Sequence, residues 1–330
     1  MQRSRYAKIK SRLLLLRWQL ARLNRAWFLK LLYKRTRPAS DRYISGDGLR
    51  RLATHLYDET ERKIDPAQIR AGDVVFVSTD YAREYFGEID PRVEAPYVLV
   101  THNSDLPADE ALVTRAGRNV IAWFAQNNSY AASRVIPAPI GLENLHHYHA
   151  GVPRRFEALG NSKTAKKNRI LVAFAIGTNA VERQPAFEIA VQTPSADCLD
   201  AWLDQDAYTQ TLTGYKFVLS PPGNGLDAHR TWEAMYLGVV PIVKESVAMC
   251  YFADLGLPLW IVRRWDELRS IDENYLEEKY EQLQEGFRCP ALFMAYWRNR
   301  IFACARSVAA GNPRTLAPVV ERPQYPDPRP

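Results

Sequence analysis

Short apolar runs that end in clusters of polar residues recur along most of this chain. The first three are Val74–Ser78 (VVFVS), Tyr97–Thr101 (YVLVT) and Val120–Phe124 (VIAWF). Polar residues follow each run, and mixed stretches with helical character separate the runs. Uninterrupted apolar runs that alternate with helices are typical of strands buried in a parallel α/β sheet. Ligands of such sheets bind at the carboxyl ends of the strands, where these polar clusters fall.

A second series of the same kind follows a polar, basic stretch from about His146 to Asn168. Its predicted strands are Ile170–Ile176, Phe217–Ser220, Val239–Val243 and Leu259–Val262, and its predicted helices run from about Asp227 to Leu237 and from Asn274 to about Ala309. The two series predict an α/β fold in which two Rossmann-like domains face each other across a cleft.

The length of 330 residues suits two domains of ordinary size. We divide the chain into a basic amphipathic helix at 1–40, an N-terminal α/β domain at 41–150, a linker at 151–168, a C-terminal α/β domain at 169–310 and a proline-rich tail at 311–330.

The first 40 residues hold twelve Lys or Arg and no Asp or Glu, so the remainder carries 7 − 12 = −5 of the net charge of +7. Apolar residues at steps of three and four, from Ile9 to Leu31, predict a helix. A basic amphipathic helix with Trp18 and Trp27 suits an anionic membrane surface. The alternatives are a helix that packs on the rest of the chain or on a partner, and an arm that binds nucleic acid. The mildly acidic body does not indicate a nucleic-acid-binding fold.

No segment approaches the about 20 apolar residues of a membrane span. The apolar runs Leu13–Leu16 and Ala26–Leu29 are shorter than the about 7–15-residue core of a secretory signal. The four cysteines show no CxxC pair, which indicates reduced thiols in the cytoplasm rather than a zinc site or a disulfide framework. We therefore expect a cytoplasmic protein, peripheral on the inner face of the membrane.

The segment Lys216–Glu233 (KFVLSPPGNGLDAHRTWE) carries the clearest chemistry. A buried strand leads to two prolines, which prevent further strand pairing. Gly223, Asn224 and Gly225 follow, and such residues tolerate positive φ and a close approach of the backbone to a ligand. Asp227 is a good N-cap for the next helix. The N–H groups and partial positive charge of a helix N-terminus favour an anion at this loop.

His229, Arg230 and Glu233 can share one face of that helix. Arg230 offers a bidentate fork to a diphosphate. Glu233, one turn further on, can accept hydrogen bonds from the two hydroxyls of a ribose. The alternative is an ordinary turn into a helix whose charged face is merely solvated. The cap, the cation and the carboxylate after a buried strand favour a nucleotide site.

These residues resemble a known family. The string KFVLSPPGNGLDAHRTWEAMYLGVVPIV is similar to the donor-binding region of exostosin-like glycosyltransferases and related bacterial enzymes. The strings RYISGDGLRRLATHLYDE, YVLVTHNSD, WFAQN and IPAPIGLEN resemble other parts of a bacterial or viral branch of that family. The resemblance extends from about Tyr43 to about Trp297.

The resemblance implies a GT-B fold, with a nucleotide-sugar donor on the C-terminal domain and a glycan or lipid-linked acceptor mainly on the N-terminal domain. It also implies an inverting transfer, no cofactor and no bound metal, in cell-surface polysaccharide synthesis. Asp204-Gln205-Asp206 has the spacing of a DxD metal motif, but it falls in a stretch with helical, surface character. The three histidines His146, His147 and His149 are spaced irregularly, and we assign no metal to them.

Further candidates follow predicted strand ends. On the donor side these are Thr178, Asn179 and Arg183, with Lys244 a weaker one. A base that deprotonates an acceptor hydroxyl needs a carboxylate or an imidazole near the cleft. Our candidates for it, in order, are Asp105, His102 and Asp47, each of which has the alternative role of a cap or turn residue. Asn127 and Asn128 can bind sugar hydroxyls or close a turn.

Two other functions remain open from the sequence. One is a different α/β enzyme that acts on sugar nucleotides, and the other is a nucleotide- or glycan-binding protein without turnover.

Overall fold

The computed structural model describes residues 36–147, 151–160, 164–199 and 203–312. The helix predicted at 1–40 and the tail predicted at 311–330 lie outside these ranges, apart from 36–40 and 311–312. No helix within these ranges is long and apolar enough to cross a membrane.

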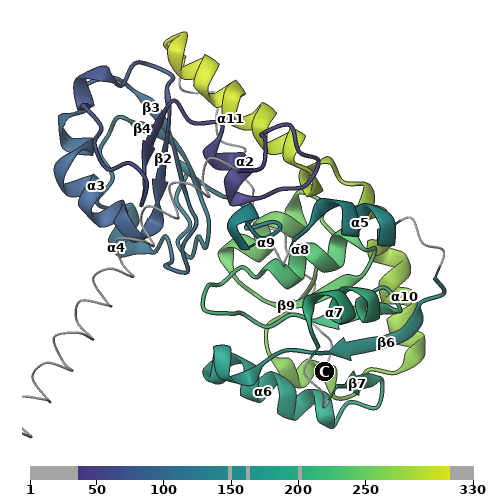
Figure 1. Ribbon diagram of the computed structural model, residues 1–330. Helices are drawn as coiled ribbons and strands as arrows, with labels where there is room; N and C mark the ends of the chain where they lie inside the picture. The colour runs from purple at the N-terminus through teal and green to yellow at the C-terminus, as the bar shows by residue number, and fades with distance from the viewer. Residues whose placement is uncertain (1–35, 148–150, 161–163, 200–202, 313–330) are drawn as a thin grey trace, which may run out of the picture.

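The first domain is built on a parallel sheet whose five strands lie side by side in chain order. The strands are β1 (His55–Tyr57), β2 (Val74–Ser78), β3 (Tyr97–His102), β4 (Val120–Ala125) and β5 (Val135–Pro137). Every residue of β2 and β3 is buried, as the uninterrupted apolar runs predict. One face of the sheet packs against α3 (Ala82–Glu88) and α4 (Glu110–Val113), and the other faces α2 (Gly46–Arg50) and α11 (Met294–Ala309) (Figure 1).

The second domain holds another parallel sheet of five strands, in the order β10-β9-β8-β6-β7. The strands are β6 (Lys167–Val172), β7 (Ala196–Cys198), β8 (Tyr215–Leu219), β9 (Val240–Lys244) and β10 (Trp260–Val262), and the helices among and after them are α6 (Ala180–Val191), α7 (Gln205–Leu212), α8 (His229–Tyr236), α9 (Val247–Asp254) and α10 (Glu273–Leu283). The chain builds outward from β6 in one direction and then from β8 in the other. The crevice between the ends of β6 and β8 is therefore a topological switch point, where ligands of open α/β sheets bind. The two parallel sheets confirm the predicted fold class.

Two local predictions differ from the structure. The strand predicted at Ile170–Ile176 begins at Lys167 and ends at Val172, because Ala173 and the residues after it leave the sheet and form part of a cleft wall. Part of the predicted linker is the helix α5 (Pro153–Gly160). Its buried Phe156 contacts the rings of Tyr43 and Tyr236.

The last helix, α11, belongs to the packing of both domains. The prediction placed it in the C-terminal domain, but it packs across β3 and β4 of the first sheet (Figure 1). The helix α11 approaches the backbone of the first domain closely at Gly72, where an added Cβ would lie 2.4 Å from the carbonyl oxygen of Ala305. One buried hydrophobic cluster runs from the first sheet through α11 to α8 and α9, so the two domains share a core.

Candidate functional site

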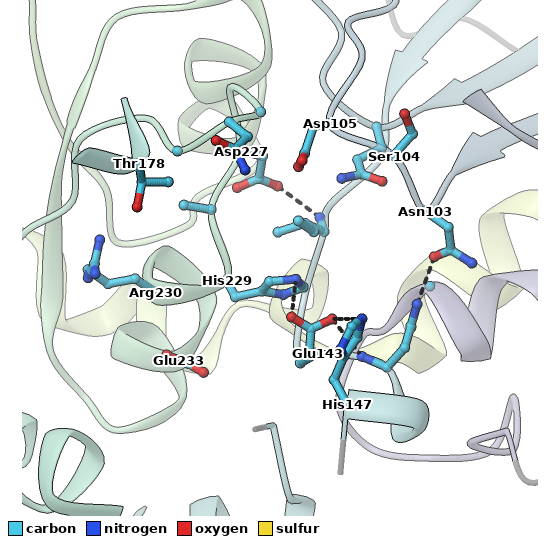
Figure 2. A pocket seen from close by; sticks show the side chains of 18 of the residues that line it. Asn103, Ser104, Asp105, Glu143, His147, Thr178, Asp227, His229, Arg230 and Glu233 are labelled. Atoms are coloured by element: carbon cyan, nitrogen blue, oxygen red, sulfur yellow. Dashed lines mark hydrogen bonds and ion pairs between the residues drawn. The ribbon is translucent and has the colours of Figure 1, made fainter. Parts of the chain in front are cut away.

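The carboxyl ends of both sheets open onto one cleft of about 1340 Å³. A pocket for one small ligand measures about 300–1,000 Å³, so this cleft has room for two substrates. Side chains of the first domain, among them Asn103, Ser104 and Asp105, line one side, and Thr178 and Arg230 line the other (Figure 2). The loops after β6 and β8 both reach the cleft, which places it at the switch point of the second sheet.

The glycine loop after β8 is held from behind by two predicted donor-site residues. Arg183 donates from Nε to the carbonyl oxygen of Pro222 at 2.9 Å and from Nη1 to that of Ala175 at 2.8 Å. Asn179 caps α6 and donates from Nδ2 to the carbonyl oxygen of Gly223 at 2.7 Å. Both side chains therefore position the loop.

This arrangement sets the direction of the loop amides. In a trans peptide the C=O and the following N–H point in opposite directions. Since the carbonyls of Pro222 and Gly223 point at Arg183 and Asn179, the N–H groups of Gly223 and Asn224 point away from them. Neither N–H has an acceptor among the described residues. Both residues line the cleft, so the loop offers it free backbone donors.

Arg230 and Arg183 bring positive charge to the same place. The guanidinium of Arg230 lies 5.8 Å from the ring centre of Phe174 and 5.7 Å from that of Tyr208. Its buried Nε has no hydrogen-bond partner among the described residues. Burial, together with the nearby charge of Arg230, lowers the pKa of Arg183 to about 10, which leaves it charged at neutral pH. Neither arginine forms an ion pair with a carboxylate of the described residues.

Glu233 lies one turn into α8 beside these arginines and is 5% exposed. Its Oε1 accepts a hydrogen bond from Gln205 Nε2 at 2.8 Å. Burial raises the pKa of Glu233, while the charges of His229 and Arg230 act in the opposite direction. A buried carboxylate at the cleft wall with one oxygen fixed is suited to accept hydroxyl hydrogen bonds on the other.

Asp227 does not cap α8, contrary to our prediction. The N-cap is Ala228, and no side chain caps the helix. The Asp227 carboxylate is buried and accepts hydrogen bonds from Ile140 N at 2.8 Å and from Trp232 Nε1 at 3.0 Å. Burial raises the pKa of Asp227 to about 6. Asp227 therefore joins the glycine loop after β8 to the first domain, and no side chain covers the N-terminus of α8.

Gly225 is required by packing and not by its backbone angle. Its φ is not positive, and an added Cβ would lie 2.6 Å from Asn127 Nδ2. Asn127 accepts from Asp227 N at 2.9 Å and donates to the Ser104 carbonyl oxygen at 3.1 Å. It is thus a contact between the domains, whereas Asn128 closes a turn by accepting from Tyr130 N.

His229 also bridges the two domains. Its Nδ1 bonds the carbonyl oxygen of Gly141 at 2.8 Å, and its Nε2 lies 3.2 Å from Glu143 (Figure 2). Burial opposes the charged imidazole, but the hydrogen bond and charge of Glu143 outweigh it and raise the pKa of His229 to about 9. Burial likewise opposes the charged Glu143, but His229 lowers the pKa of Glu143 to about 2. Both ring nitrogens of His229 are therefore occupied.

Two of the three candidate bases are tied into the first domain. His102 is 1% exposed, with Nε2 bonded to the Pro139 carbonyl oxygen and Nδ1 bonded by Asn103 N. Burial lowers the pKa of His102. Asp47 is fully buried, does not line the cleft, and accepts from Leu145 N at 2.8 Å. Both residues stabilise the loops around the cleft.

Asp105 differs from these two candidates. It is exposed at the cleft and makes no hydrogen bond or ion pair with the described residues. Figure 2 shows it between Ser104 and Asp227, at the border of the two domains. Of the predicted bases, it alone combines a free carboxylate with access to the cleft.

Other candidates have separate roles. Thr178 and Asn224 are exposed at the cleft, as expected of ligand contacts. Lys244 binds Glu182 at 2.8 Å and does not line the cleft.

In the part of the chain that the structure describes, the clustered histidines do not form a metal site with other side chains. His146 and His147 line the cleft, with ring centres 4.1 Å apart, and His149 lies outside the described residues. Among the described residues, no three His, Cys, Asp or Glu side chains are grouped to hold a metal ion.

No protein-family model and no curated protein matches this chain. Solved structures that it resembles include the α,α-trehalose 6-phosphate synthase from Burkholderia multivorans, at 12% identity over 74% of this chain and 72% of that chain, with a TM-score of 0.43. Another is a UDP-forming α,α-trehalose-phosphate synthase from Burkholderia xenovorans, at 12% identity, coverage of 74% and 75%, and a TM-score of 0.41. A third is Anabaena HepE in complex with UDP-glucose, at 11% identity, coverage of 74% and 78%, and a TM-score of 0.31.

The fold of this chain, two parallel α/β domains that face one cleft, is GT-B-like by its own topology. The exostosin-like assignment stays a prediction.

Glu143 and Gln205 are the main site residues that sequence reasoning did not single out. Glu143 belongs to the quoted string IPAPIGLEN, and Gln205 belongs to the DQD triplet considered only as a metal motif. Neither stands near α8 in the sequence, so their contacts with His229 and Glu233 follow from the fold.

Proposed function

We propose that this chain is a glycosyltransferase that moves a sugar from a nucleoside diphosphate sugar to a glycan or lipid-linked acceptor. The donor binds at the switch point of the second domain, and the acceptor enters from the first domain.

One observation carries the proposal. Within the part of the chain that the structure describes, two arginines without carboxylate partners, free loop amides and an uncapped helix N-terminus converge on the same wall of the cleft. Each of these features favours an anion, and a diphosphate satisfies all of them. Glu233, a short distance along α8, suits the hydroxyls of an attached ribose.

The transfer follows from this placement. The acceptor hydroxyl oxygen forms the new bond to the anomeric carbon as the bond from that carbon to the diphosphate oxygen breaks. The nucleoside diphosphate leaves with the bonding electrons, and Arg230 and the loop amides stabilise its charge. Asp105 takes the hydroxyl proton. Attack on the face opposite the leaving group inverts the anomeric centre.

The first experiment is a screen of nucleotide sugars for thermal stabilisation, followed by measurement of nucleoside diphosphate release with a panel of acceptors. We expect release of free nucleoside diphosphate that depends on an acceptor. Conversion of the donor without such release would indicate another sugar-nucleotide enzyme. Binding with no turnover of any donor would indicate a binding protein.

We also propose that residues 1–40 hold the enzyme on the inner face of the membrane, in cell-surface polysaccharide synthesis. The charge of the segment supports this, since its cations are not balanced by any acid. In a flotation assay, the full chain should float with anionic vesicles, and the variant that lacks residues 1–40 should not. Equal flotation of both forms would contradict the proposal.

A further inference from the structure

Three consecutive amide side chains follow β4, and two of them are bonded within the protein. Asn127 accepts a hydrogen bond from Asp227 N at 2.9 Å, and Asn128 accepts one from Tyr130 N at 3.1 Å. Gln126 lines the cleft and is 2% exposed, yet its side-chain amide makes no hydrogen bond with the described residues, and its Oε1 is buried. Buried amides are normally paired, and an unpaired one is costly. The amide of Gln126 therefore points to a partner that the described chain does not supply.

Gln126 lies at the border of the two domains. The next residue, Asn127, donates from Nδ2 to the carbonyl oxygen of Ser104 at 3.1 Å, one residue before Asp105. A Cβ added at Gly225 would lie 2.6 Å from the same Nδ2. Gln126 thus adjoins a residue that contacts both the loop of the candidate base and the glycine loop of the donor site.

In the proposed reaction, the transferred sugar lies at this border. Its anomeric carbon is attached to the diphosphate, which Arg230 and the glycine loop hold, and the attacking hydroxyl comes from the side of Asp105. The sugar ring therefore lies between these two groups, in the part of the cleft that Gln126 lines. A carboxamide has both a donor and an acceptor, and a sugar hydroxyl can bond either of them.

We infer that Gln126 binds a hydroxyl group of the sugar that is being transferred and thereby helps to select the donor sugar. This inference rests on the proposed function. Arg230 and Glu233 bind the nucleoside diphosphate part of the donor, whereas Gln126 contacts the sugar alone. Loss of its amide should therefore weaken the binding of a nucleotide sugar and leave the binding of the free nucleoside diphosphate unchanged.

The test is calorimetric titration of the wild type, Gln126→Met and the control Gln68→Met with a nucleoside diphosphate and with the matching nucleotide sugar. The probes are UDP with UDP-glucose, UDP-galactose and UDP-N-acetylglucosamine, and GDP with GDP-mannose, and the nucleotide sugar that binds the wild type most tightly is used. Methionine keeps the length of glutamine without its amide, and Gln68 is exposed and does not line the cleft. Gln126→Met should bind the nucleotide sugar about two- to tenfold more weakly, the effect of one neutral hydrogen bond, and should bind the nucleoside diphosphate as the wild type does. Gln68→Met should match the wild type with both ligands.

Two further measurements separate a sugar contact from a structural role. The Tm of Gln126→Met should equal or exceed that of the wild type, because the substitution removes a buried amide that has no partner among the described residues. The wild type is also titrated with monodeoxy analogues of the same nucleotide sugar. One analogue should bind the wild type more weakly by a similar factor, and Gln126→Met should not distinguish that analogue from the parent sugar.

The outcomes distinguish this inference from the proposed function. An equal loss of affinity for both ligands would overturn the inference, because Gln126 would then act on the nucleotide site. Unchanged affinity for both would also overturn it and would leave an ordered water as the partner of the amide, and a rise in the acceptor KM alone would assign the amide to the acceptor instead. Each of these results leaves the proposed function standing, whereas a wild type that binds no nucleotide would overturn the proposed function itself.

Discussion

Glu143→Gln should destabilise the chain at pH 6 and have much less effect at pH 10. The substitution removes the negative partner of His229 while keeping a side chain of the same shape. His229 and Glu143 come from different domains and are 3.2 Å apart, so the pair joins α8 to the loop after β5. Its loss should therefore be seen in the stability of the whole chain.

The magnitude follows from the pKa of His229. The rise from the ordinary value of 6.5 to about 9 corresponds to about 3 kcal/mol, at about 1.36 kcal/mol for each pKa unit. The two side chains are 30% and 24% exposed, so solvent screens part of this energy. We expect about 2 kcal/mol for the loss of the pair at pH 6.

The sign of the pH dependence is fixed by the two shifts. The raised pKa of His229 gives stability that is complete below 6.5 and is lost as the pH rises through about 9. The lowered pKa of Glu143 gives stability that is complete above 4.5 and is lost as the pH falls toward about 2. The pair therefore contributes most between pH 4.5 and 6.5.

Thermal unfolding of the wild type and of Glu143→Gln, from pH 5 to pH 10, measures this difference. Glu94→Gln, which removes an exposed carboxylate that has no ion pair with the residues the structure describes, is the control for net charge. The difference between wild type and Glu143→Gln should shrink above pH 9. A difference in Tm that is the same at pH 6 and pH 10 would refute the ion pair as its cause.

Three other outcomes are expected. Arg183→Lys should weaken UDP binding by about tenfold in calorimetry, because a lysine cannot hold both carbonyls in a fork; unchanged affinity would contradict the role given to Arg183. Asp105→Asn should lower kcat by about 10²–10⁴-fold with UDP affinity unchanged, and activity near that of the wild type would exclude it as the base. Gly225→Ala should lower the free energy of unfolding, measured with denaturant, by about 1–3 kcal/mol, since the added methyl group would clash with Asn127. A variant as stable as the wild type would contradict this packing.

The fold was largely predictable because buried parallel strands have a strong sequence signal. Val74–Ser78 forms a strand with the predicted bounds. The bounds of β6 were wrong because Ala173 and Phe174 are apolar for another reason, as part of the cleft wall. The place of α11 was not predictable, since an apolar helix face does not say which sheet it covers, and in the structure α11 contacts β3 and β4 of the first sheet.

The site was predictable in composition but not in the roles of its residues. The string from Gly223 to Glu233 does reach the cleft. Asp227 and His229, however, bind the first domain, because each meets a polar group that is distant in the sequence. No carboxylate of the described residues forms an ion pair with Arg230, and its contact with a diphosphate stays a prediction.

The central claim is that Arg230 binds the diphosphate of a nucleotide donor. Calorimetric titration of UDP and GDP into the wild type, Arg230→Gln and the control Arg118→Gln, an exposed arginine that does not line the cleft, tests it most directly. Loss of the charge-assisted contact should weaken the nucleotide binding free energy of Arg230→Gln by about 1.5–3 kcal/mol, which raises its Kd by about 10–150-fold. The nucleotide affinity of Arg118→Gln should equal that of the wild type. Equal nucleotide affinity in all three proteins would contradict the assignment of the donor site.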